Sequence, residues 1–213
     1  MKHSWNLIVL VILIFFIFCK KETIENFVIS KNRNVVSGRD SREYSVVSKF
    51  GNNETAAELM RKNNIFIISL LRYIRNKYLF KKHGTNKEQQ FVSRVLSRYN
   101  PDMVFENWPK DGEDTSFVVN KGEKFGLCLR SKKTMEFHPA DLLQFVTIHE
   151  LTHMGTITYG HNKEFWSWMK FMLVQAKAAG LHTPVNYSEK PVMYCGLEVV
   201  SNPYFIDHDW NQH

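Results

Sequence analysis

Two histidines four residues apart, His149 and His153, enclose a glutamate in the run His-Glu-Leu-Thr-His. Residues at this spacing lie on the same face of a helix, so both imidazoles can reach one point. Zinc accepts such a pair, and Glu150 then lies beside the open position of the metal. A carboxylate there can take a proton from a zinc-bound water as it attacks a carbonyl. The spacing predicts one catalytic Zn²⁺, with Glu150 as general base; the alternative is a surface helix that merely carries two histidines.

A catalytic zinc usually has three protein ligands and leaves a fourth position for water. His161 is the best third ligand, because Gly155 and Gly160 flank a short β-branched run in which the chain can turn back toward the helix. Two alternatives stay open. His161 could cap the helix that follows Asn162, or Glu164 could replace it in a ligand set of two histidines and a glutamate.

Other side chains are weaker candidates for the site. Tyr159 and Tyr194 could polarise the scissile carbonyl or stabilise the oxyanion, although most tyrosines are simply packed. His138 precedes the metal-binding helix and is either a support for a ligand or an ordinary loop histidine. The histidines whose spacing recommends no role are His182, His208 and His213.

The elements around the motif can be read from its flanks. Leu142, Phe145 and Ile148 recur at helical spacing, so a helix is expected over residues 141–155, with Asp141 as N-cap. Other apolar stripes predict helices from Thr55 to Tyr78, over residues 87–99 and from Asn162.

Strands are expected between these helices. Residues 115–120 and 124–130 flank a glycine-containing turn and predict a hairpin, in which Cys128 faces away from Phe125, Leu127 and Leu129. Further strands are expected at 104–106 and 193–199. Because helices and strands are segregated along the chain, the pattern predicts an α+β fold with N-terminal helices, a small antiparallel sheet and a metal-binding helix.

The N-terminal segment is apolar and uncharged from residue 5 to residue 19. Its unbroken apolar part is shorter than the ~20 residues of an average membrane span, so a cleaved signal peptide is the alternative. No small-residue cleavage site follows, and Lys20-Lys21 come next. We therefore expect one transmembrane helix in a membrane anchor over residues 1–21 that meets lipid through 5–19, then a polar tether over 22–52 and the catalytic domain over 53–213.

Charge and cysteines bear on the compartment. Basic residues are denser after the apolar segment than before it, which favours a cytosolic catalytic domain. Cys19, Cys128 and Cys195 are widely spaced and form no disulfide framework, which agrees. Glycosylation sequons at Asn53 and Asn186 argue for the opposite orientation.

The net charge of +7 comes from lysines and arginines scattered along the chain. No long basic run or RNA-binding signature is present, so nucleic acid is not expected as a partner. A basic surface near anionic lipid headgroups explains the charge more simply.

Three segments together resemble the WLM/SprT-like zincin metallopeptidases: residues 125–130 (FGLCLR), 149–153 (HELTH) and 160–166 (GHNKEFW). The tail at 191–196 is similar to WLM-like proteins of large DNA viruses. The resemblance implies a zincin-like domain in which His149, His153 and His161 bind zinc and Glu150 is the catalytic base. It also implies that an extended peptide lies beside the strand at 125–130 by β-addition.

These observations predict a membrane-anchored zinc metalloendopeptidase that cleaves protein or peptide substrates, in a virion or a host membrane. Two other functions stay open. One is a catalytically silent zincin-fold protein with a structural role in a membrane or virion. The other is a DNA-stimulated protease that acts on DNA–protein crosslinks.

Overall fold

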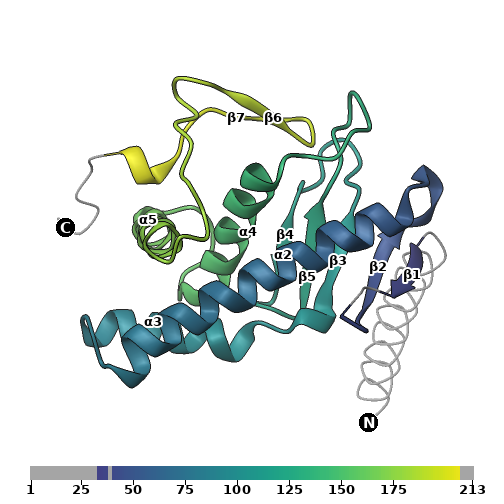
Figure 1. Ribbon diagram of the computed structural model, residues 1–213. Coiled ribbons are helices and arrows are strands. Elements are labelled where there is room, and N and C mark those ends of the chain that lie inside the picture. Colours follow the sequence, from purple (N-terminus) through teal and green to yellow (C-terminus); the bar gives the residue numbers. More distant parts are fainter. Residues whose placement is uncertain (1–32, 38–39, 207–213) are drawn as a thin grey trace, which may run out of the picture.

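The computed structural model describes residues 33–37 and 40–206. A five-stranded sheet forms one layer and helices form the other (Figure 1). The strands lie in the order β1-β2-β3-β5-β4. Their bounds are β1 Arg33–Ser37, β2 Glu43–Val47, β3 Val104–Asn107, β4 Phe117–Val119 and β5 Lys124–Cys128.

Four long helices and a C-terminal hairpin complete the described fold. The helices are α2 Asn53–Ile74, α3 Asn86–Arg98, α4 Ala140–Gly155 and α5 Lys163–Ala178, and the hairpin strands are β6 Val192–Tyr194 and β7 Leu197–Val199. Short helical segments are η1 Ser48–Phe50, the π-helical η2 Arg75–Phe80, η3 Pro101–Met103 and η4 Pro203–Phe205.

The sheet is mixed, so the prediction of an antiparallel sheet is wrong in part. The β4–β5 hairpin is antiparallel as expected, and so is β1 with β2. However, β3 runs parallel to both β2 and β5. The helices α2 and α3 connect β2 to β3, and such a helical crossover returns the chain in the same direction.

The predicted polar tether over residues 22–52 is contradicted where β1 and β2 lie within it. Tyr44 and Val46 of β2 are buried at 2% and 0% exposure. An antiparallel pair of strands that packs one face on the core needs apolar residues on that face only, which is why this stretch is so polar in sequence. The described domain therefore includes residues on the N-terminal side of residue 53.

Within the described residues, no helix is both long enough and apolar enough to cross a bilayer. The anchor predicted at residues 5–19 lies outside the described part of the chain.

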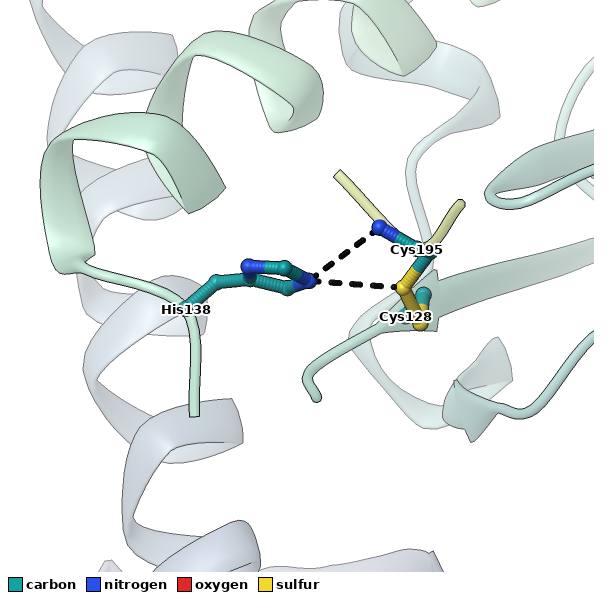
Figure 2. Close-up of side chains that lie close together, drawn as sticks. All are labelled: Cys128, His138 and Cys195. Carbon is teal, nitrogen blue, oxygen red and sulfur yellow. Dashed lines mark hydrogen bonds between the residues drawn. A yellow bond between two sulfur atoms is a disulfide. The ribbon is translucent and has the colours of Figure 1, made fainter. Parts of the chain in front are cut away.

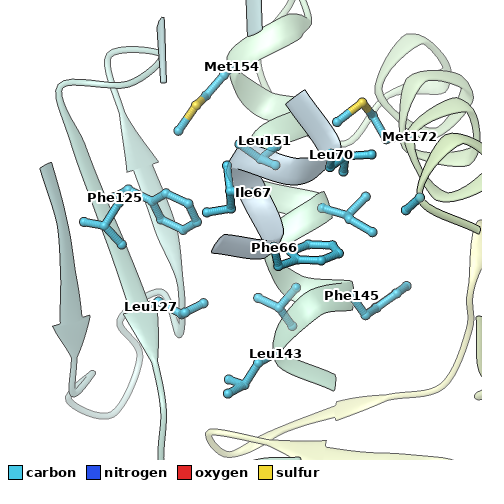
Figure 3. Packing of buried hydrophobic residues seen from close by; sticks show 14 of the residues in the cluster. Phe66, Ile67, Leu70, Phe125, Leu127, Leu143, Phe145, Leu151, Met154 and Met172 are labelled. Atoms are coloured by element: carbon cyan, nitrogen blue, oxygen red, sulfur yellow. The ribbon is translucent and has the colours of Figure 1, made fainter. Parts of the chain in front are cut away.

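The core lies between the sheet and α4, with α2 packed across both (Figure 3). Ile67 and Leu70 of α2 are fully buried, as are Leu127 of β5 and Leu151 of α4. The helix α4 is apolar on nearly all sides and is enclosed by α2, α3, α5 and β4. A helix packed on every side is held rigidly, which suits a segment that positions ligands.

The close approach of α3 to α4 depends on Gly155. A Cβ atom at this position would collide with the ring of Phe91 and with Val95. Beyond the helix end, Arg94 Nε donates to the Gly155 carbonyl oxygen at 2.6 Å, and Arg98 donates to the Met154 carbonyl oxygen at 2.5 Å. These guanidinium groups satisfy carbonyls that α4 itself leaves without partners.

Two helices, α3 and α5, start within one residue of the predicted positions, whereas the predicted N-cap of α4 is wrong. Thr85 caps α3 in a capping box with Glu88, and Asn162 caps α5 by accepting from the Phe165 amide at 3.0 Å. Asp141 does not cap α4. The extended residue Pro139 occupies the N-cap position without a side-chain hydrogen bond, which places Asp141 in the first turn.

The C-terminal segment differs from the predicted single strand. Cys195 and Gly196, both with positive φ, turn the chain between β6 and β7. Cys195 also forms a disulfide with Cys128 of β5 (Figure 2). The expectation that the cysteines form no disulfide framework is therefore wrong for this pair, because a sequence separation of 67 residues conceals a contact that only the folded sheet creates.

Candidate metal centre

The three predicted ligands converge on one point. His149 and His153 project from successive turns of α4, and His161 returns from the loop before α5. The Nε2 atoms are 3.2 Å apart for His149 and His153, 3.1 Å for His153 and His161, and 2.8 Å for His161 and His149. Each nitrogen thus faces the other two.

This triangle fits a tetrahedral metal. Nitrogens bound at about 2.0–2.1 Å to a tetrahedral zinc are roughly 3.3 Å from one another, close to the observed separations. Three imidazole nitrogens also cannot all donate to one another, so without a cation some lone pairs face each other. The donor set, the spacing and the convergence all suit a zinc ion.

Phe165, the third residue of α5, supports the ligands. Its ring centroid lies 4.7 Å from that of His149, 4.3 Å from His153 and 4.8 Å from His161, and the side chain is fully buried. Trp166 adds a stacked contact with His161 at 5.6 Å. Aromatic packing against each imidazole restricts the ring rotations that would separate the nitrogens.

The environment keeps the histidines in the neutral, metal-binding form. Burial, together with the neighbouring imidazoles, holds the pKa of His149 well below its ordinary value. Burial lowers the pKa of His153 to about 4, with contributions from His161 and Lys121. A proton therefore competes weakly for the lone pairs at neutral pH.

Glu150 borders the same site. Its side chain is 4% exposed, and its Oε2 atom is buried without a hydrogen-bond partner among the described residues. Burial, with a contribution from Asp114, raises the pKa of this carboxyl to about 8. An unpaired buried carboxylate is costly, so ionisation of Glu150 requires a ligand at this atom, such as a water or a cation.

The loop that carries His161 is held through Thr158. Its hydroxyl donates to Glu164 Oε2 at 2.5 Å, and the same carboxylate accepts from the Thr158 amide at 3.4 Å. From the opposite side, Lys121 Nζ donates to the Thr158 carbonyl oxygen at 2.8 Å. These contacts explain how a spacing of seven residues between His153 and His161 still closes the triangle. Glu164 therefore points to the loop rather than to the metal centre.

A cleft of about 250 Å³ opens beside the histidines. Five of its other lining residues were not predicted to belong to the site, because they come from β4, the residues before it and the hairpin turn. They are Asp114, Ser116, Phe117, Val118 and Lys121, and Gly160 joins them from the loop that carries His161. The only signal for them in the sequence is the predicted hairpin itself, which does not reveal which side of it meets the helix.

Of the weaker candidates for the site, only Tyr159 lines the cleft. Tyr159 lies at the cleft and is 78% exposed, with Lys121 Nζ 4.4 Å from its ring centroid. Tyr194 is buried behind the cleft, where its hydroxyl contacts Ser116 Oγ at 2.6 Å and donates to the Cys128 carbonyl oxygen at 2.8 Å. His138 lies beside Cys195, and His182 contacts Gln144 at 3.1 Å, so neither belongs to the three-histidine cluster.

The strand expected to accept a peptide is largely occupied by its neighbours in the sheet. β5 pairs with β3 over Phe125–Cys128 and with β4 over Lys124–Gly126, so it is flanked on both sides at Phe125 and Gly126. Within the described residues, β4 pairs only with β5 and is the margin of the sheet. Phe117 and Val118 of β4 line the cleft. A peptide added to this sheet beside the metal centre would therefore lie along β4.

Relatives of the chain occur in large DNA viruses. It is 30% identical over 196 residues to protein R325 of Acanthamoeba polyphaga mimivirus, and the alignment covers 91% of both chains. Protein 136R of invertebrate iridescent virus 6 is 30% identical over 104 residues, which is 47% of this chain and 55% of that protein. No family model matches the chain.

Among solved structures, the chain is similar to Wss1 from Saccharomyces cerevisiae, with a TM-score of 0.42 and 22% identity over 63% of this chain and 89% of that one. The identity to R325 extends along nearly the whole length of both proteins, and it assigns the chain to a family. This protein belongs to the family of mimivirus R325.

Proposed function

We propose that the protein is a zinc-dependent peptidase in which His149, His153 and His161 hold one zinc ion and Glu150 is the general base. One observation supports this most directly. Three Nε2 atoms lie within 3.2 Å of one another, beside a buried glutamate oxygen that has no partner among the described residues. The likeness of the three sequence segments to WLM/SprT-like peptidases agrees with it.

A bound zinc would supply a Lewis acid and a water of lowered pKa. Glu150 would accept the proton of the attacking water and pass it to the leaving amine. The burial that raises the pKa of Glu150 also makes the carboxylate a stronger base than an exposed one. Tyr159, at the exposed rim of the cleft, is placed to meet a substrate, whereas the Tyr194 hydroxyl is already engaged.

The substrate would be a peptide in extended conformation. The free margin of β4 offers backbone groups, and Phe117 and Val118 offer apolar surface for alternate side chains. Besides Glu150 and the histidines, the cleft is lined by one side chain of each charge, Asp114 and Lys121, so its wall has no single charge preference.

A catalytically silent role fits less well. A structural zinc site needs no buried base at its open side, and burying an unpaired carboxylate costs stability. Glu150 is therefore best explained by chemistry. No described feature favours the DNA-stimulated alternative over a peptidase without such a signal.

The membrane part of the proposal rests on sequence alone. We propose that residues 1–21 anchor the protein in a virion or host membrane, with lipid contact through residues 5–19. The catalytic domain would then lie on the cytosolic side.

Substitution of Glu150 by glutamine tests the mechanism. Glu150→Gln keeps the shape of the side chain but cannot accept a proton. We therefore expect about one zinc per chain while the Cys128–Cys195 disulfide is intact, and a loss of roughly 10²–10⁴ in turnover. Metal content and cleavage of a peptide library by the full-length chain are the measurements. The control is Glu198→Gln, at an exposed glutamate of β7.

Cleavage by Glu150→Gln at the wild-type rate would refute the assignment of the base. Loss of zinc from this variant would instead make Glu150 a ligand. Absence of zinc from the wild-type chain would overturn the proposed function itself.

A further inference from the structure

A second group of metal-ligating side chains lies apart from the three histidines. Cys128 comes from β5, His138 from the segment before α4, and Cys195 from the turn between β6 and β7. Figure 2 shows the imidazole of His138 directed at Cys195, next to the disulfide. All three side chains are buried, and the catalytic proposal uses none of them.

The donor atoms of this cluster are close together. The three ligand atoms lie within 4.8 Å of one another, and His138 Nε2 is 3.5 Å from Cys195 Sγ. The carbonyl oxygen of Arg130 lies 3.1 Å from Cys195 Sγ and 3.4 Å from Cys128 Sγ. Two sulfurs, one imidazole nitrogen and one backbone oxygen therefore lie together in one buried cluster.

We propose that Cys128, His138 and Cys195 form a second metal site, which holds one zinc ion when the cysteines are reduced and is replaced by the disulfide when they are oxidised. The Arg130 carbonyl oxygen is the nearest fourth donor. Sulfur and imidazole ligands select zinc over magnesium or calcium, which prefer oxygen.

Conversion of the disulfide into the zinc site requires a reductant, and an external dithiol supplies it. The dithiol gives two electrons and two protons to the disulfide, which becomes two thiols while the dithiol becomes a disulfide. Zinc binding then releases the two thiol protons, and the ion is bound by two thiolates. The charges of two thiolates and Zn²⁺ cancel, so the complex suits a site shielded from water.

Both states hold the same elements together. Either the disulfide or the metal would join β5 to the β6–β7 turn, where Tyr194 precedes Cys195. The Tyr194 hydroxyl contacts Ser116, which lines the catalytic cleft. The proposed site would therefore keep this wall of the cleft in place under reducing and oxidising conditions alike.

Cobalt(II) is the probe, since only thiolate ligands give an intense near-ultraviolet thiolate-to-cobalt absorption. The full-length chain with Cys19→Ser is used, so that the two cluster cysteines are the only ones left. We expect the reduced protein to bind two cobalt ions with this absorption. The same protein with the disulfide intact should bind one ion without it.

His138→Ala should weaken the thiolate-bound cobalt by at least about tenfold while the other ion stays bound. The matched control is His182→Ala, because His182 is equally buried, at 5% exposure against 6% for His138. His149→Ala with His153→Ala should remove the first ion and leave the thiolate absorption, so this test is independent of the proposed peptidase.

Absence of a cobalt ion with thiolate absorption from the reduced Cys19→Ser protein would overturn the proposal, whether or not the three-histidine site binds cobalt. This comparison uses one sequence in two redox states. It therefore tests the proposed metal site even if a histidine variant does not fold.

Discussion

His161 and Glu164 are three residues apart, yet they make different contacts. His161 completes the nitrogen triangle, whereas Glu164 binds the backbone and hydroxyl of Thr158. We expect His161→Ala to reduce zinc affinity by more than about 10²-fold, because loss of a ligand exceeds the roughly 10–100-fold cost of losing a supporting group. Glu164→Ala should cost about tenfold, through a looser loop. Competition with a chromophoric chelator measures both.

Circular dichroism of both variants serves as the control for folding. The opposite result is that His161→Ala binds zinc as tightly as the wild type while Glu164→Ala does not bind it. This result would establish a ligand set of two histidines and a glutamate.

Single residues were predictable where the signal is local. His149, Glu150 and His153 follow from one helical turn, and Asn162 follows from the capping preference of asparagine. Phe165, Lys121 and Ser116 were not predictable as parts of the site. Their roles depend on which elements meet in space, and nothing in a window of neighbouring residues encodes that.

Among the elements, β2, β3 and the end of β5 are joined by one buried ion pair. Arg130 Nε donates to Glu106 Oε1 at 2.9 Å, and both side chains are at most 2% exposed. The other oxygen of Glu106 accepts from the Val47 amide at 2.7 Å, and Arg130 also donates to the Gly51 carbonyl oxygen at 3.0 Å. The pair therefore ties the N-terminal strands to the rest of the sheet.

We expect Glu106→Gln to lower the free energy of unfolding by about 3–5 kcal/mol, because it leaves the Arg130 charge buried without a counter-ion. The matched control is Asp102→Asn, which breaks an ion pair with Arg42 at 2.6 Å whose side chains are 71% and 40% exposed. An exposed pair contributes about 0–1 kcal/mol. Equal losses in urea denaturation of the two variants would contradict this explanation.

The helices and the β4–β5 hairpin were predictable, since periodicity and turn residues are local. The parallel pairing of β3 with β2 and β5 was not, because it depends on where the crossover helices return the chain. The disulfide between Cys128 and Cys195 could not be predicted for a related reason. The two cysteines lie on a central strand and in a hairpin turn, and no local sequence pattern relates these two segments.

For the whole molecule, buried titratable groups predict an optimum of stability near neutral pH in the metal-free protein. Burial lowers the pKa values of His138, His149, His153, His161 and His182. The unfolded chain therefore binds more protons below pH ~6.5, and the free energy of unfolding falls as the pH drops from ~6.5 toward ~4. The expected slope is at least about 1.4 kcal/mol per pH unit.

Glu150 acts in the opposite direction. Its pKa is raised to about 8, so the folded protein gains stability as the pH falls from 8 toward the ordinary carboxyl value. Urea unfolding in a chelator between pH 5 and pH 8.5 should show a maximum near pH 6.5–7. In Glu150→Gln the decline above this maximum should disappear, and an unchanged profile would contradict the assignment.

The proposed anchor would make the intact protein resistant to alkaline carbonate extraction. We expect the full-length chain in the membrane pellet and a variant lacking residues 1–21 in the supernatant, because ~0.8 kcal/mol per buried CH₂ holds an apolar segment in lipid. Recovery of a mature N-terminus near residue 20 would show that the segment is a signal peptide.

The margin of β4 has a consequence for what such an enzyme could digest. Three residues, Phe117–Val119, span only about 10 Å of strand. A polypeptide aligned there would gain very few main-chain hydrogen bonds, too few to pull a segment out of a folded domain. Substrates of such an enzyme would be selected by their lack of stable structure. Flexible tails, nicked loops and denatured proteins would be cut, and compactly folded proteins in the same membrane would not.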